Sequence, residues 1–263
     1  MGCLAGLDIG SAFAKAVILK DHSIASFSIA TTEGNFKRAA EKVLENALQK
    51  ANLSQSDIEV IGGTGLGTSF IPYSYMRITD ILCHSRGVNY LFPTVRTVIE
   101  VGNQASKVIK VTPNGKVADC LMSDKCAAGS GRILQIIARV LGIAIDEMGK
   151  LSSQSDRPAK FTTGCAVFLE TEAISRVAEG TPKADIIAGI HRSIASKTLA
   201  MARRLRLEPD YAITGGGAKD EGLVKTMEEL LGAPLLVPQE PLITAAIGAA
   251  LIARERKNHS GEL

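Results

Sequence analysis

The sequence has no tryptophan, and its few aromatic residues narrow the partners that it can bind. Aromatic residues are 4% of the 263 residues. Proteins that hold single-stranded nucleic acids stack bases on aromatic side chains, so a platform of that kind is disfavoured. The formal net charge is only +3, from 30 Lys and Arg against 27 Asp and Glu. Since nucleic-acid-binding domains usually carry a clustered basic excess, we expect no nucleic acid partner.

Long hydrophobic runs are also absent. No apolar stretch approaches the roughly 18–20 residues that cross a bilayer. The sequence shows no basic segment followed by an apolar core near its start, as a secretory signal would have. We therefore expect a cytoplasmic protein without a membrane partner. The 46% of hydrophobic residues and the length are typical of a globular chain that forms one large domain or two small ones.

Cysteine is scarce, and its spacing argues against two kinds of site. The five cysteines are Cys3, Cys83, Cys120, Cys126 and Cys165, and none belongs to a Cys-x-x-Cys pair. An odd number in a chain of this length argues against a disulfide framework. Without a Cys-x-x-Cys pair, a mononuclear zinc site from one chain has little support. We expect Cys83 and Cys120 to be small buried hydrophobic residues.

The hydrophobic pattern predicts the same order of elements in both halves of the chain: three strands, a helix and a further strand. The first half has strands at 4–10, 14–19 and 24–30, a helix at 35–51 and a strand at 58–61. The second half has strands at 97–102, 107–112 and 116–122, helices from about 129, 165 and 185, and a strand at 211–214. We expect two α/β lobes with a cleft between them, at residues 1–94 plus 244–263 and at 95–243.

Each predicted lobe opens with an acidic residue and a glycine at the end of a strand. In the first lobe, Asp8 precedes Gly10 and Ser11, and Lys15 lies on the next strand. A carboxylate in this place can hold Mg²⁺ through water while turn N–H groups face phosphate, and Lys15 can neutralise phosphate charge. The alternative is that Asp8 caps a turn and Lys15 is a surface residue.

The second lobe repeats this layout with Glu100, Gly102, Asn103 and Gln104. Gln104 is suited to orient an attacking water, as a glutamine does in other nucleotide hydrolases, or it is simply a turn residue.

Three successive glycines, Gly215, Gly216 and Gly217, follow the strand at 211–214 and precede a helix. They allow the backbone to approach a ligand closely, and the helix N-terminus beyond them favours an anion or a ribose phosphate. The alternative is an ordinary strand-to-helix turn. No Gly-Lys-Ser/Thr follows this turn or the glycines at 62–67, so neither is a P-loop.

Two cysteines stand just before predicted helices. Cys126 precedes a small-residue loop that opens one helix, and Cys165 begins another. Helix N-termini stabilise thiolates, and two thiolates are half of the usual four ligands of a [4Fe–4S] cluster. A two-fold dimer would supply the other two. The alternative is a pair of catalytic or merely buried thiols.

Seven segments complete the pattern: Leu7–Ser11, Val98–Gln104, Ser123–Arg132, Cys165–Glu172, Ile187–Ser193, Thr214–Ala218 and Ala246–Ala250. Together they resemble the ATP-dependent activators of 2-hydroxyacyl-CoA dehydratases, a family that includes the ATPase subunits of benzoyl-CoA reductases. The resemblance covers nearly the whole chain, and the two cysteine segments are its most specific marks.

This resemblance implies an actin/hexokinase-like ATPase fold of two ribonuclease-H-like lobes, with ATP and Mg²⁺ in the cleft between them, near Asp8 and Glu100. It implies a homodimer that holds one [4Fe–4S] cluster through Cys126 and Cys165 of each subunit. ATP hydrolysis would drive one electron, supplied by ferredoxin or flavodoxin in an anaerobic cytoplasm, to a partner dehydratase or reductase. That partner carries iron–sulfur clusters of its own and performs radical chemistry on a CoA thioester.

The chain departs from the family at two turns. Glu100, Asn103 and Ala105 stand where the family usually has Asp, Gly and Asp, and Asp220–Leu223 replaces an Asn-containing turn common in dehydratase activators. Two other functions stay open. One is a small-molecule kinase of the same fold, for which Glu100 is the only candidate base. The other is a nucleotide-binding scaffold that does not hydrolyse ATP.

Overall fold

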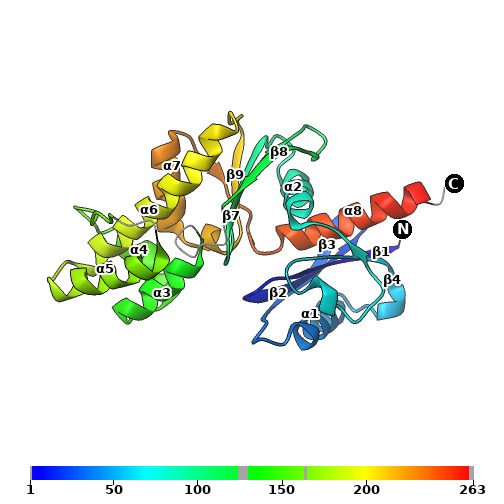
Figure 1. Ribbon diagram of the computed structural model, residues 1–263. Coiled ribbons are helices and arrows are strands. Elements are labelled where there is room, and N and C mark those ends of the chain that lie inside the picture. The colour runs from blue at the N-terminus through cyan, green and yellow to red at the C-terminus, as the bar shows by residue number, and fades with distance from the viewer. Residues whose placement is uncertain (1, 124–129, 163–164, 261–263) are drawn as a thin grey trace. The chain divides into compact units, whose positions relative to one another are not determined.

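The computed structural model describes residues 2–123, 130–162 and 165–260 (Figure 1). The chain divides into two compact units. Unit 1 comprises Met1–Thr94, Val111–Ala118 and Leu242–Leu263, and unit 2 comprises Val95–Lys110 and Asp119–Pro241. In the described part of the chain, no helix combines the length and apolar character that a bilayer-spanning helix needs.

Unit 1 is built on a five-stranded mixed sheet with the strand order β3-β2-β1-β4-β5. The strands are β1 (Cys3–Ile9), β2 (Phe13–Lys20), β3 (Ser23–Thr31), β4 (Ile58–Thr64) and β5 (Met76–Arg77). The first three form an antiparallel meander, and β4 runs parallel to β1. Asp21 and His22 join β2 to β3 with φ values of 49° and 67°, as a tight hairpin turn requires.

Helices cover both faces of this sheet. On one face lies α1 (Phe36–Lys50), which packs on alternate β1 residues such as Leu7 and Ile9. Its start is fixed by Asn35, whose side chain accepts a hydrogen bond from the Arg38 N–H at 3.0 Å. On the other face lies α8 (Thr244–Ser260), which packs on Leu4, a β1 residue whose side chain points the opposite way. Because successive side chains of a strand point to opposite faces, β1 is buried along its whole length.

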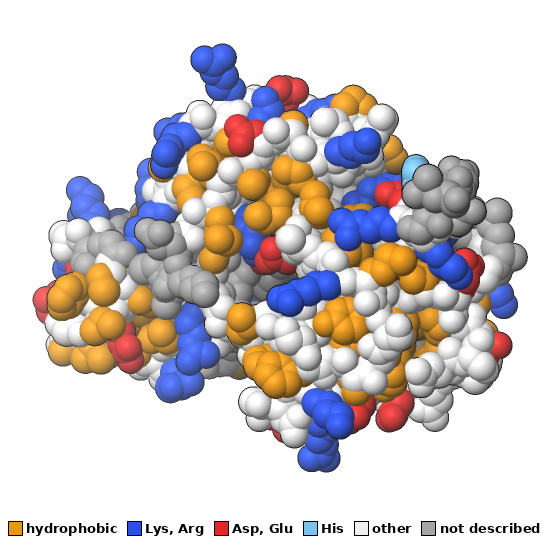
Figure 2. Space-filling model, turned by 45° about the vertical axis from the view of Figure 1, so that its right-hand side comes forward, with side chains coloured by type: hydrophobic (Ala, Val, Ile, Leu, Met, Phe, Trp, Pro, Cys, Tyr) orange, Lys and Arg blue, Asp and Glu red, His pale blue; other side chains and the backbone are white. Residues whose placement is uncertain are grey.

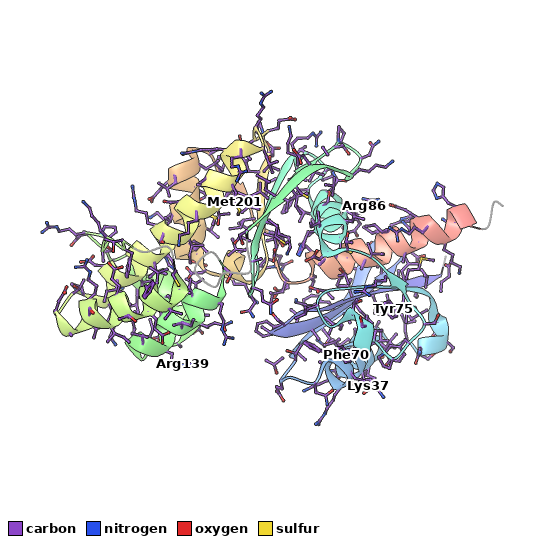
Figure 3. All side chains as sticks on the ribbon, viewed as in Figure 1. Lys37, Phe70, Tyr75, Arg86, Arg139 and Met201 are labelled. Carbon is purple, nitrogen blue, oxygen red and sulfur yellow. The ribbon has the colours of Figure 1, made fainter. Side chains whose placement is uncertain are left out.

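The helix α8 approaches its neighbours so closely that only glycine fits at the contacts. A Cβ at Gly6 of β1 or Gly62 of β4 would overlap a backbone carbonyl of α8. The neighbouring helix α2 (Asp80–Leu91) lies beside α8 in Figure 1, and Gly87 of α2 and Gly248 of α8 meet the partner helix's carbonyls in the same way. At the rim of this contact, Arg86 (Figure 3) reaches Glu255 at 2.8 Å.

The close packing also corrects one expectation. The predicted strand at 58–61 was expected to end at Gly62, but β4 continues through Gly62 and Gly63 to Thr64. A Cβ at Gly63 would lie 2.5 Å from the Tyr75 ring, so these two glycines make room for neighbours on both faces. They are strand residues, because glycine is the only residue that the helix on one side and the ring on the other leave space for.

Unit 2 repeats the strand arrangement of unit 1. Its sheet has the order β10-β9-β6-β7-β8, with β6 antiparallel to β7 and parallel to β9. Thus β6, β7 and β9 stand in the places of β1, β2 and β4. The strands are β6 (Thr97–Val101), β7 (Ser106–Val111), β8 (Val117–Met122), β9 (Tyr211–Thr214) and β10 (Leu235–Leu236).

The helices of unit 2 share one large hydrophobic core with β6, β7 and β9. They are α3 (Arg132–Leu141), α4 (Met148–Ser152), α5 (Ala166–Ala178), α6 (Lys183–Arg204) and α7 (Glu221–Leu231). Gly142 and Gly232 end α3 and α7 with φ values of 60° and 74°, the left-handed conformation that glycine adopts without strain.

The α/β class and the repeated strand order confirm the fold predicted from the sequence. Two short elements, α4 and β5, were not predicted, because five and two residues are too few to show a periodic pattern. The hydrophobic pattern predicts a closing helix over about 245–256, and α8 extends to Ser260.

Gly248 offers a test of the α8 contact. Replacing glycine by alanine inside a helix normally stabilises it by about 1 kcal/mol. At Gly248 the new Cβ would overlap the Cys83 carbonyl, so we expect Gly248→Ala to lower the free energy of unfolding by about 1–3 kcal/mol instead. Gly131→Ala is the control, because a Cβ there meets nothing closer than 3.4 Å. Urea denaturation of both variants measures the difference, and a stabilised Gly248→Ala protein would contradict the close contact.

Candidate functional site

A buried ion pair marks the end of β1 in unit 1. Asp8 on β1 and Lys15 on β2 are direct partners in the antiparallel register, so the hairpin itself places their side chains together. The Lys15 Nζ lies 2.8 Å from Oδ2 of Asp8, and both side chains are 10% exposed. Such a pair holds a carboxylate and an ammonium group at the end of a central strand, largely shielded from water.

Unit 2 contains the same pair in the same place. Glu100 on β6 and Lys107 on β7 are register partners, and the Lys107 Nζ donates to Oε2 of Glu100 at 2.6 Å. Both side chains are less than a tenth exposed. Lys107 was not among the predicted site residues. The sequence does carry the signal, since a lysine follows each acid at the same spacing of seven residues.

The turns next to the two pairs have the same hydrogen bond. The Gly10 N–H donates to the Phe13 carbonyl at 2.9 Å, and the Gly102 N–H donates to the Ala105 carbonyl at 3.1 Å. A Cβ at Gly10 would lie 3.1 Å from the Lys15 Nζ, and one at Gly102 would overlap the Glu100 carboxylate. Each glycine therefore keeps the space beside its ion pair clear.

A second glycine in each unit borders the other oxygen of the carboxylate. A Cβ at Gly65 would lie 2.5 Å from Oδ1 of Asp8, and one at Gly215 would lie 3.1 Å from Oε1 of Glu100. Both glycines have positive φ, 91° and 83°, and they follow the equivalent strands β4 and β9. In each unit, then, a lysine holds one carboxylate oxygen and a glycine turn borders the other. The sequence singled out the glycines at 62–67 only as a loop that is not a P-loop.

The three glycines at 215–217 have different surroundings. Gly215 borders Glu100 as described, Gly216 is exposed, and Gly217 is buried against the Val101 side chain. The structure thus brings the predicted triple-glycine turn to the same place as the predicted acidic residue of unit 2. Glycine is needed at 217 because the position packs against β6, and at 215 because its backbone φ is positive.

The other predicted turn residues lie near the pairs. Ser11 is half-buried, and its carbonyl accepts a hydrogen bond from the Thr32 hydroxyl at 2.9 Å. Gln104 is exposed. The Asn103 side chain is directed toward α3, where the Gln135 amide donates to it at 3.4 Å.

The turn at Gly102 and Asn103 is fastened to the segment that leads into α3. The Gly131 N–H donates to the Gly102 carbonyl at 2.7 Å, and the Ser130 hydroxyl donates to the Asn103 carbonyl at 3.0 Å. Cys126 was predicted to stand in this segment, and it lies outside the described residues. The turn at Gly102 and Asn103 is therefore hydrogen-bonded to Ser130, the first described residue after Cys126 in the sequence.

The four described cysteines differ in burial. Cys165 is exposed and stands at the N-cap of α5, whereas Cys3 and Cys83 are buried and Cys120 is half-buried. Burial raises the pKa of the Cys83 thiol to about 12, so this thiol stays protonated at neutral pH. Among the described residues, no three His, Cys, Asp or Glu side chains gather as a metal site.

Two apolar side chains at the start of α5 are exposed. Val167 and Phe168, next to Cys165, are 67% and 63% exposed, and Ile174 further along the helix is 53% exposed. On the face shown in Figure 2, the described Lys and Arg side chains lie in separate small groups among hydrophobic and uncharged atoms, and they form no continuous basic patch there.

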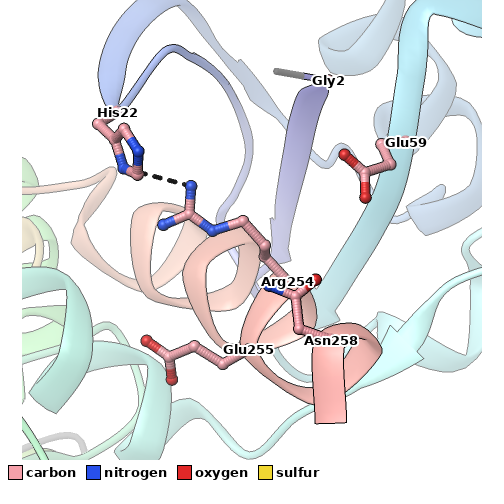
Figure 4. A pocket seen from close by; sticks show the side chains of 6 residues that line it. All are labelled: Gly2, His22, Glu59, Arg254, Glu255 and Asn258. Atoms are coloured by element: carbon pink, nitrogen blue, oxygen red, sulfur yellow. Dashed lines mark hydrogen bonds between the residues drawn. The ribbon is translucent and has the colours of Figure 1, made fainter. Parts of the chain in front are cut away.

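A surface hollow of about 430 Å³ in unit 1 is a separate feature. It is lined by Gly2, His22, Glu59, Arg254, Glu255 and Asn258 (Figure 4). Gly2 precedes β1 whereas Asp8 ends it, which puts about 20 Å of strand between the hollow and the ion pair. Its two carboxylates are already paired, since Lys257 contacts Glu59 and Arg86 contacts Glu255, and Arg254 lies 3.3 Å from the His22 ring nitrogen. We assign it no part in the site.

Comparison with known proteins gives a consistent result. The model of the BadF/BadG/BcrA/BcrD ATPase family matches residues 5–253. The chain is 36% identical over 255 residues to a 2-hydroxyisocaproyl-CoA dehydratase activator of Clostridioides difficile, covering 97% of this chain and 96% of the relative. It is 34% identical over 263 residues to a benzoyl-CoA reductase subunit of Thauera aromatica, covering 95% and 93%.

Solved structures confirm the predicted fold. The activator of the 2-hydroxyisocaproyl-CoA dehydratase from Clostridium difficile with bound ADPNP superimposes with a TM-score of 0.91 at 35% identity, covering 99% of this chain and 98% of that one. A ROK-family glucokinase from Streptomyces griseus gives a TM-score of 0.58 at 15% identity, over 97% and 100%. The latter likeness concerns the fold alone and confirms the actin/hexokinase-like class.

The contrast between Cys83 and Cys165 predicts selective alkylation. Thiolate is the reactive form, and the raised pKa keeps Cys83 protonated at pH 8. We expect iodoacetamide to modify the exposed Cys165 of the folded, metal-free protein and to leave Cys83 unmodified until guanidinium unfolds the chain. Peptide mass spectrometry before and after unfolding measures both sites. Early modification of Cys83 in folded protein would show that its burial is wrong.

Proposed function

We propose, from the premise that the chain belongs to the BadF/BadG/BcrA/BcrD ATPase family, that it is an ATP-driven activator of a dehydratase or reductase acting on a CoA thioester. It couples ATP hydrolysis to the transfer of one electron to that partner. The observation that carries this proposal is the pair of buried carboxylate–lysine sites, one in each unit, each with a glycine turn on either side of its carboxylate.

These sites fit the parts of Mg·ATP. Asp8 and Glu100 supply the hard oxygen ligands that Mg²⁺ prefers, directly or through water. Lys15 and Lys107 neutralise phosphate charge. The turns that the Gly10 and Gly102 N–H groups close present Ser11 and Asn103 to the phosphates. With Mg²⁺ held at the carboxylates, Lys15 and Lys107 would each contact a phosphate oxygen. The preassembled charges need little rearrangement, which favours the charged transition state.

The exposed Gln104 orients the attacking water. The glycines at 215–217 hold the nucleoside. Gly216 is exposed and leaves the backbone open to a flat ligand, whereas Gly215 and Gly217 are buried against Glu100 and Val101. A kinase function is disfavoured, because Glu100, the only candidate base, is engaged by Lys107 at 2.6 Å. The likeness to a glucokinase concerns the fold alone.

A [4Fe–4S] cluster fits the exposed thiol of Cys165 at the start of α5. When bound, the cluster supplies the low-potential electron. Cys165 suits a ligand because it is an exposed thiol at the N-terminus of a helix, where thiolates are stabilised. We assign Cys126 as the second ligand and propose that two subunits share one cluster, so that each provides two thiolates. The exposed Val167 and Phe168 beside Cys165 would be covered by the second subunit.

The backbone connection between the two sites supports a coupling route. ATP contacts the turn at Gly102 and Asn103, and that turn is hydrogen-bonded to Gly131 and Ser130. A shift of the turn on nucleotide binding therefore moves the start of α3, which packs on α5 in the core of unit 2. Both cysteine segments thus respond to nucleotide, and the partner enzyme meets a different surface in each state. Ferredoxin or flavodoxin in an anaerobic cytoplasm would then reduce the protein again for the next transfer.

The carboxylates provide the first test. We expect Asp8→Asn and Glu100→Gln each to reduce ATP hydrolysis at least about 100-fold, because each removes a metal ligand without changing side-chain size. Glu59→Gln, a surface carboxylate of the unit 1 hollow, is the matched control and should keep full activity. Calorimetry with Mg·ATP on the wild-type chain accompanies the assay. No binding heat from folded protein would refute the nucleotide site.

The cysteines provide the second test. Anaerobic purification should give about two irons per chain, from four irons shared by two chains. Cys126→Ser and Cys165→Ser should each lose the iron, while Cys83→Ser and Cys120→Ser should retain it. Iron and sulfide analysis with size-exclusion chromatography measures both cluster and dimer. Four irons per chain, or a loaded Cys165→Ser protein, would rule out a shared cluster.

A further inference from the structure

A buried histidine lies behind the triple-glycine turn, and the site described above does not use it. His191 on α6 is fully buried, and its Nε2 lies 3.0 Å from Oδ2 of Asp220. A carboxylate accepts hydrogen bonds and does not donate them, so the ring hydrogen is on Nε2. The other ring nitrogen, Nδ1, is also buried and has no hydrogen-bond partner in the described part of the chain.

The unpartnered nitrogen shows that packing alone does not favour an imidazole at this position. A buried polar atom without a partner costs free energy that an apolar side chain of similar size would not. Within the described ranges, the polar contact of His191 Nε2 is the one with Asp220. The value of the imidazole therefore lies in what it does for Asp220.

Asp220 joins the glycine turn to α7. Its own N–H donates to the Gly217 carbonyl at 3.2 Å and closes the turn. Its Oδ1 accepts from the Leu223 N–H at 3.1 Å and caps α7. The same side chain thus ends the turn and begins the helix, while its second oxygen is held by His191.

The surrounding helices leave this carboxylate little freedom. A Cβ at Gly149 of α4 would lie 3.0 Å from Oδ1 of Asp220. A Cβ at Gly222 of α7 would overlap the Ser152 hydroxyl and lie 2.9 Å from the His191 ring. Glycines of α4 and α7 thus allow close packing around the contact with α6, and the hydrogen bond from His191 sets where the end of the turn stands.

We infer that His191 is a positioning residue for the nucleoside-binding turn: through Asp220 it holds Gly215–Gly217 in the conformation that receives the nucleoside. This inference rests on the proposed function, since it takes that turn to bind the nucleoside of ATP. His191 itself touches no substrate. Its effect reaches the nucleoside, which ATP and ADP share, and not the phosphates, which Lys15 and Lys107 contact.

The experiment compares ATP and ADP. Wild type, His191→Leu, His191→Gln and Asp220→Ser are titrated with Mg·ADPNP and Mg·ADP by calorimetry, with Tm measured on each protein. Leucine removes the donor, whereas the glutamine amide places a donor near the position of Nε2. Serine keeps the cap of α7 but loses the contact with His191. Lys107→Met is the contrast, because it alters a phosphate contact.

We expect His191→Leu and Asp220→Ser to bind both nucleotides about tenfold more weakly, with the ratio of the two Kd values unchanged. His191→Gln should restore binding to within about threefold of wild type. Lys107→Met should weaken ADPNP binding more than ADP binding. If His191→Leu fails to fold, the Asp220→Ser and His191→Gln proteins carry the same test.

The outcomes separate this inference from the proposed function. Wild-type protein that binds neither nucleotide overturns the proposed function and this inference with it. Wild-type protein that binds both, with Asp220→Ser or folded His191→Leu binding equally well, overturns the inference alone. The inference is also overturned if a His191 or Asp220 variant changes the ratio of the two Kd values as Lys107→Met does. The histidine would then act on phosphate binding.

Discussion

A carboxylate buried at the end of a central strand needs a cation beside it, and both units supply one from the neighbouring strand. The hairpin register meets that requirement, because it places the lysine directly opposite the acidic residue. Such a pair contributes little to stability, since two apolar residues of similar volume would serve as well. Its value is functional: the carboxylate is in place to bind Mg²⁺, and the lysine is in place to bind the phosphates of ATP.

The surroundings of the first pair depend on glycine far from it in sequence. Because α8 rests directly on the backbone of β1 and β4, it covers the face that α1 leaves open. Water is thereby kept from both sides of β1, and Asp8 lies in a region of low dielectric constant. The glycines at positions 6 and 62 therefore affect the chemistry of Asp8 as well as the packing of a helix.

Much of this architecture was predictable from local signals. The caps of α1 and α7 and the hairpin turn between β2 and β3 each follow from a few neighbouring residues. The extent of β4 was not predictable, because only α8, at the other end of the chain, explains why glycines belong to a strand. Lys107 was overlooked although its spacing repeats that of Lys15. The contact of His191 with Asp220 joins two helices, and no periodicity in the sequence reports such a contact.

The bonds that fasten the turn at Gly102 to Gly131 and Ser130 end on main-chain carbonyl oxygens, and one of them also begins on a main-chain nitrogen. Atoms of the main chain are the same whatever the side chain. An alanine scan would therefore leave the Gly131 link intact, and homologous chains can drift at these positions without losing it. Only proline at 131, or an ester in place of the amide, would cut it. A main-chain connection of this kind can be kept in homologous proteins without any conserved side chain.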